Sequence, residues 1–76
     1  MNNLLEKNLN DYREGLQELN NIDLLFEYKF ACTEVERYRQ LAKNNPDNKD
    51  LQKRLDYEKK IEKICKDAVI NRMGDH

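Results

Sequence analysis

The first part of the chain carries one apolar stripe at helical spacing. Leu5, Leu9, Tyr12, Leu16 and Leu19 follow one another at intervals of four, three, four and three residues. Side chains at these intervals lie on one face of an α-helix, because the helix completes a turn every 3.6 residues. The pattern predicts an amphipathic helix over about residues 3–20.

Two features modify this first helix. Gly15 costs roughly 1 kcal/mol relative to alanine in a helix interior, so we expect either a closely approaching neighbour helix or a local bend. Asn20, Asn21 and Asp23 are good N-cap residues and predict that a second helix begins here. The alternative is a single helix that bends at this point, since neither glycine nor proline forces a stop.

The second helix is predicted over about residues 23–43, and it has apolar side chains on two opposite faces. One face carries a long stripe: Leu24, Tyr28, Ala31, Val35, Tyr38 and Ala42. Phe26, Phe30 and Leu41 fall on the nearly opposite face. One neighbouring helix cannot cover both faces. The second helix is therefore expected to lie between the other two, or to bury one face against another chain.

An asparagine-rich turn separates the second helix from the third. Asn44 suits the left-handed position that follows a helix, Asn45 suits the next N-cap, and Pro46 suits the first helical position. These residues predict a third helix over about residues 46–72. It would be ~40 Å long, against roughly 30 Å for the second helix. Its far end is expected to project beyond its neighbours.

These elements predict an all-α fold in which residues 1–76 form one small domain, an antiparallel three-helix arrangement with the second helix in the centre. A chain of 76 residues buries only about 60% of the surface that its unfolded form exposes. Such chains commonly gain stability from a partner. The apolar area is large for the layers that one chain supplies, which favours a homodimer.

Charge and composition narrow the choice of partners and location. The net charge is −1, from 14 basic and 15 acidic residues, so no bulk charge attracts nucleic acid or an anionic membrane. No apolar run approaches the roughly 20 residues that span a bilayer, and the N-terminus does not resemble a signal peptide. We therefore expect a cytoplasmic protein without a membrane partner. Abundant asparagine and an excess of lysine over arginine indicate an AT-rich genome, bacterial or phage.

Few residues could support catalysis or bind a metal. His76 is the only histidine, and Cys32 and Cys65 lie on apolar stripes without a base to activate them. Metal sites need several ligands at defined spacing, and phosphate cradles need a glycine-rich loop. In a hairpin that turns at Asn45 the cysteines would be offset by ~10 Å along the axis, too far for a disulfide. The sequence predicts a non-enzymatic protein with free thiols and no metal, cofactor or small-molecule substrate.

The leading functional prediction is a protein-interaction module, a regulator, inhibitor or adaptor that binds a larger protein. The expected contact residues belong to the second face of the second helix, to an acidic pair on the third helix and to its projecting end: Phe26, Phe30, Leu41, Glu58, Glu62, Val69, Ile70 and Met73. Buried aromatic side chains supply much of the energy of protein interfaces.

Each part of this prediction has a structural alternative. The first helix could instead cover Phe26 and Phe30, which would make them core residues. Glu58 and Glu62 could instead pair with Arg37 or Arg39 at the rim of the hairpin.

Two other functions compete with this one. The third helix carries a lysine row that could follow a phosphate backbone: Lys53, Lys59, Lys60, Lys63 and Lys66. No interleaved aromatic residues accompany these lysines, and the chain is slightly acidic, so the charge pattern favours protein over nucleic acid as the partner. The third candidate is a structural coiled-coil subunit of a larger assembly.

Overall fold

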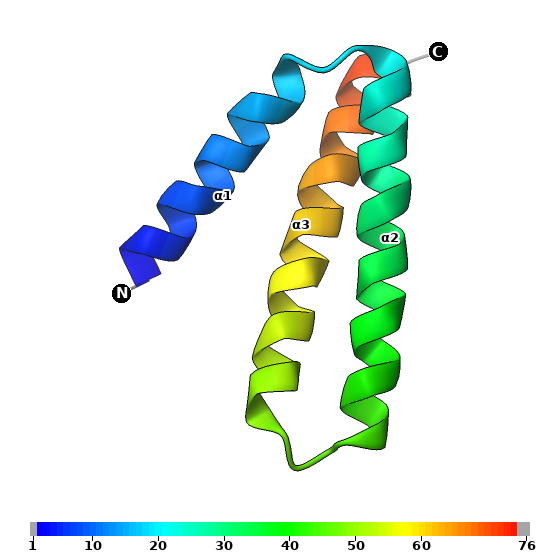
Figure 1. Cartoon of the computed structure of the whole chain (residues 1–76). Coiled ribbons are helices and arrows are strands. Elements are labelled where there is room, and N and C mark those ends of the chain that lie inside the picture. Colours follow the sequence, from blue (N-terminus) through cyan, green and yellow to red (C-terminus); the bar gives the residue numbers. More distant parts are fainter. Residues whose placement is uncertain (1, 75–76) are drawn as a thin grey trace.

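The computed structural model describes residues 2–74, with side chains from residue 8 onward, and all regular structure in this range is helical (Figure 1). Helix α1 spans Asn2–Gln17, α2 spans Asn21–Asn44 and α3 spans Lys49–Met73. The prediction of an all-helical chain with three packed helices is confirmed. Leu5, the first residue of the predicted stripe, lies outside the residues whose side chains are described.

Helices α2 and α3 form a hairpin. They lie side by side along their lengths, and the C-terminal end of α3 lies beside the N-terminal end of α2 (Figure 1). The two helices have 24 and 25 residues, so the predicted projection of the third helix beyond the second is wrong. The second helix is longer than predicted at both ends, and the third begins later because residues 45–48 form the turn.

The turn uses its asparagines differently from the prediction. Asn45 ends α2: its backbone N–H donates to the carbonyl of Ala42, and its side-chain amide donates to the carbonyl of Leu41 (2.9 Å). The backbone N–H of Asn48 donates to the carbonyl of Asn45 (3.0 Å), which closes a tight turn with Pro46 at its second position. Pro46 therefore serves the turn and not the first position of the next helix.

Asn48 is the residue that caps α3. Its side-chain oxygen accepts hydrogen bonds from the backbone N–H groups of Asp50 (3.1 Å) and Leu51 (3.2 Å), which would otherwise lack partners at the start of a helix. The prediction that Asn45 caps the third helix is wrong. Asn44 is helical, and no non-glycine residue in the described part of the chain adopts the left-handed conformation.

Helix α1 packs mainly against α3 and makes fewer contacts with α2, so α3 and not α2 is the helix that packs most closely against both others. The predicted central position of the second helix is therefore wrong. The break before α2 occurs where the sequence predicts it: the side chain of Asn20 accepts a hydrogen bond from the backbone of Asp23 (2.8 Å). A single bent helix is excluded. Towards its N-terminus α1 diverges from the hairpin (Figure 1).

Arg72 of α3 holds the C-terminal end of α1. Its guanidinium donates to the carbonyls of Leu16 (3.2 Å), Gln17 (3.3 Å) and Leu19. The last carbonyls of a helix have no partners within the helix and carry partial negative charge. One cation therefore satisfies several of these groups and joins the last turn of α1 to the last turn of α3.

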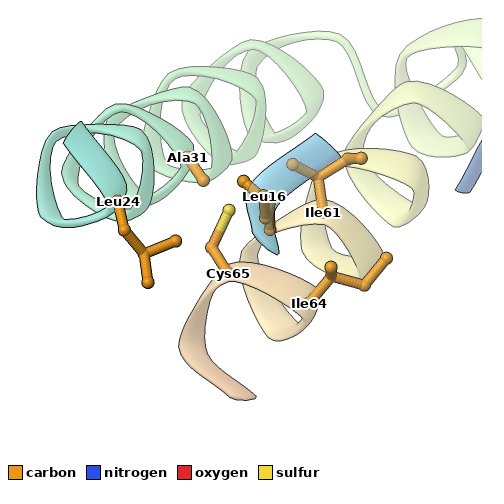
Figure 2. Close-up of a cluster of buried hydrophobic side chains, with 6 residues drawn as sticks. All are labelled: Leu16, Leu24, Ala31, Ile61, Ile64 and Cys65. Atoms are coloured by element: carbon orange, nitrogen blue, oxygen red, sulfur yellow. The ribbon is translucent and has the colours of Figure 1, made fainter. Parts of the chain in front are cut away.

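The main core lies where the three helices meet (Figure 2). We call it the three-helix cluster, and it consists of Leu16, Leu24, Ala31, Ile61, Ile64 and Cys65. A smaller hairpin cluster lies nearer the turn and consists of Val35, Ala42 and Leu55. Gly15 is exposed, and a Cβ atom there would meet nothing within 4 Å. The predicted close approach of a helix at Gly15 is therefore wrong.

Candidate protein-binding surface

Large apolar side chains are exposed on the side of α2 that faces away from α3. Their exposed fractions are 66% for Ile22, 46% for Leu25, 65% for Phe26 and 60% for Phe30. We call these four residues the outer α2 face. They point outward because Leu24 and its stripe face the core, and residues two positions away on a helix lie about 200° apart. The alternative in which the first helix covers Phe26 and Phe30 is wrong.

A shallow hollow of about 190 Å³ lies on this face, lined by Ile22, Leu25, Phe26 and Lys29. These positions have the spacing i, i+3, i+4 and i+7, which defines the hole that receives a side chain of a facing helix in knobs-into-holes packing. A cavity of ~150 Å³ can hold a benzene ring, so the hollow has the size for one aromatic side chain. Sequence reasoning missed Lys29 as part of this face, although helical spacing around Phe26 identifies it.

The other predicted apolar contact residues do not join this face. Leu41 is half-buried and lies near the turn, ~16 Å along the helix axis from Phe30. Val69 and Met73 are half-buried and pack against the three-helix cluster, whereas Ile70 is 49% exposed on α3. The structure thus brings Phe26 and Phe30 together. A partner contact at the end of α3 stays a prediction.

The two residues of the predicted acidic pair, Glu58 and Glu62, differ in burial. Glu58 is only 7% exposed, and its carboxylate accepts a hydrogen bond from Arg54 Nε (2.7 Å), whose guanidinium lies 5.2 Å from the ring centre of Tyr38. The ion pair therefore lies within α3, with a buried carboxylate and an exposed guanidinium. Glu62 is half-buried.

The predicted rim pairing of Glu58 and Glu62 with arginines of the facing helix is wrong. Arg37 pairs with Glu34 (3.4 Å), and Arg39 pairs with Glu36 (2.7 Å). Both arginines therefore bond one turn back on their own helix.

The predicted nucleic-acid residues are all exposed on α3: Lys53, Lys59, Lys60, Lys63 and Lys66. Lys63 lies 4.0 Å from Asp67 of the same helix. Nucleic-acid binding stays a prediction.

One polar contact joins all three helices at the edge of the three-helix cluster. The Tyr12 hydroxyl donates to Glu27 Oε2 (2.9 Å) and lies 3.2 Å from Cys65 Sγ. Burial, followed by the hydrogen bonds to Cys65 and Glu27, raises the pKa of Tyr12 above its ordinary range. Burial also raises the pKa of the Cys65 thiol. Cys65 is fully buried, and both cysteines are free, so the Cys65 thiol packs as a protonated core side chain.

This contact predicts a loss of stability at alkaline pH. Below the ordinary thiol pKa of 9.0, Cys65 keeps its proton in both states and the stability is fully present. As the pH rises above that value, the unfolded chain releases the proton first, so stability falls towards the folded-state pKa. We expect the thermal unfolding midpoint to fall as the pH rises above 9.0, and to fall less in Cys65→Ala. An equal fall in both proteins would show that Cys65 is not the cause.

Two kinds of site are absent from the part of the chain that the structure describes. Among residues 8–74, whose side chains are described, no group of three or more histidine, cysteine, aspartate or glutamate side chains could hold a metal ion. No helix within residues 2–74 has the length and apolar character needed to cross a membrane. His76 lies outside the described residues. No family model, curated protein or solved structure matches the chain.

Proposed function

We propose that this chain is a non-enzymatic protein-binding module of a bacterium or phage. It acts in the cytoplasm as a regulator, inhibitor or adaptor, and it binds a larger protein through the outer α2 face. A single small domain of antiparallel helices presents this face. The observation that carries the proposal is the exposure of Phe26 and Phe30 beside Ile22 and Leu25.

The size and composition of the face support binding. The four side chains together expose on the order of 500 Å², near the upper end of the largest apolar patches on monomeric proteins, which are often functional. Phenylalanine buries a large area with few rotatable bonds, and aromatic residues are enriched at the centre of protein interfaces. Two phenylalanine rings exposed to water do not stabilise the isolated chain, whereas binding to a partner would bury them and stabilise the complex.

The test is quantitative capture of proteins by the immobilised full chain from a lysate of its host. We expect the double variant Phe26→Ala with Phe30→Ala to lower capture of the bound protein at least tenfold, because exposed aromatic anchors contribute most of such binding. The matched control is Ile70→Ala, which removes an exposed apolar side chain of α3. Circular dichroism should show unchanged helix content in both variants.

Three outcomes separate the alternatives. Capture that persists in the double variant would overturn the proposal, and a lower unfolding midpoint would then identify Phe26 and Phe30 as core residues. Loss of capture only in Ile70→Ala would place the site at the end of α3. Capture that is abolished by nuclease treatment of the lysate would support the lysine row as a nucleic-acid site.

A further inference from the structure

We infer that a second copy of this chain docks on the outer α2 face when the larger partner is absent, with the two α2 helices antiparallel about a two-fold axis near Phe26. The homodimer and the complex with the larger protein then compete for the same surface. This regulation rests on the proposed function, whereas the dimer itself stands on the geometry of the face.

The shape of the outer α2 face favours a second copy as its occupant. The hollow lined by Ile22, Leu25, Phe26 and Lys29 has the geometry of a hole in knobs-into-holes packing, and no side chain of a facing helix occupies it. In an antiparallel pairing about Phe26, the Phe26 ring of each copy lies over the hollow of the other. Ile22 of one copy then lies next to Phe30 of the second copy. The face is therefore complementary to itself, as a two-fold interface requires.

The chain does not fill this hollow itself. All four lining residues belong to α2, α3 packs against the opposite side of that helix, and α1 packs mainly against α3. Phe30 is not among the residues that line the hollow of its own copy. A side chain from another molecule is needed to fill it.

The area and the charges of the outer α2 face also fit a second copy. Two copies of the face would bury on the order of 1,000 Å², close to the lower limit for a specific interface. A dimer of this size is weak enough for a larger partner to displace it. The pairing also brings Lys29 level with Asp23 of the second copy, so no like charges lie level with each other along the helices.

The test measures the association of the full chain by sedimentation equilibrium, from low micromolar to submillimolar concentration. We expect a monomer–dimer equilibrium in the wild type. Ile22→Glu and Phe30→Lys should each raise the dissociation constant roughly 100-fold, because a two-fold interface contains each substitution twice. Ile70→Glu on α3 is the matched control and should dimerise as the wild type does.

Mixing the two variants tests the antiparallel geometry. The introduced carboxylate of Ile22→Glu then lies next to the introduced ammonium of Phe30→Lys at one end, and the native pair remains at the other end. We expect the mixture to associate at least tenfold more tightly than either variant alone. In a parallel pairing the two introduced charges would lie far from each other, and mixing the variants would not restore association.

The outcomes are distinct from those of the capture experiment. A wild type that stays monomeric throughout the concentration range would overturn the dimer, as would dimerisation unaffected by Ile22→Glu and Phe30→Lys. A mixture without restored association would overturn the antiparallel pairing. Any of these results leaves the proposed partner binding intact, whereas persistent capture by the double alanine variant overturns that function and leaves the dimer in place.

Discussion

Leu24→Ala is expected to lower the free energy of unfolding by roughly 2–5 kcal/mol, while Leu25→Ala leaves it nearly unchanged. Leu24 is fully buried in the three-helix cluster, whereas Leu25 is 46% exposed. Both substitutions remove the same atoms from adjacent positions of one helix. Helix propensity is therefore matched, and the difference reports burial and the cavity that remains after truncation.

The effect of Leu24→Ala is large for a chain of this length. A destabilisation of 1 kcal/mol shifts the unfolding midpoint by roughly 4–8 °C in a domain of 60–100 residues, so we expect a fall of about 10 °C or more. The measurement is thermal unfolding followed by circular dichroism at low micromolar concentration, where we expect the proposed homodimer to be dissociated. Equal shifts for Leu24→Ala and Leu25→Ala would show that the two faces of α2 are buried to the same extent.

This pair of positions shows what the sequence pattern predicts well. The spacing of apolar residues separates the stripe of Leu24 from the face of Phe26 and Phe30, and the structure keeps the two sets on opposite sides. Direction around a helix depends only on the fixed angle between successive residues. The pattern therefore predicts which side chains share a face, without information about the neighbouring helix.

The pattern predicts less well where several residues compete for one role. Asn44, Asn45 and Asn48 all have side chains that can end or begin a helix. The structure uses Asn45 for the end of α2 and Asn48 for the start of α3. The third helix therefore starts three residues later than predicted, and together with the longer α2 this removes the predicted overhang of the third helix. Local preference alone does not choose between caps that are each favourable.

Contacts between distant residues were not predictable from the pattern. Arg72 bonds to carbonyls more than fifty positions earlier, and Tyr12 approaches Cys65 across the core. Both depend on how α1 lies on α3, which side-chain periodicity does not encode. At Gly15 the pattern suggests a contact that does not form. Glycine can mark close packing of helices, but Gly15 faces open space.

Leu16→Ala is expected to detach α1 while the hairpin stays folded. Leu16 is 2% exposed, and among the α1 side chains that the structure describes it is the one buried in the three-helix cluster. Truncation should cost roughly 2–5 kcal/mol. Because α2 and α3 pack along their lengths and α1 contacts mainly α3, this loss falls on the docking of α1. Backbone amides of α1 should then exchange hydrogen at least 30-fold faster.

Hydrogen exchange at single amides measures this prediction, and the adjacent position supplies its control. Gly15→Ala adds a methyl group where nothing lies within 4 Å, and it should slow exchange in α1 because alanine stabilises a helix by up to about 1 kcal/mol relative to glycine. Amides near Val35 and Leu55, in the hairpin cluster, should keep their protection in both variants. Equal loss of protection in all three helices of Leu16→Ala would instead show that the chain unfolds as one unit. Faster exchange confined to α1 would show that the hairpin is stable alone, and that the outer α2 face remains available to a partner when α1 is released.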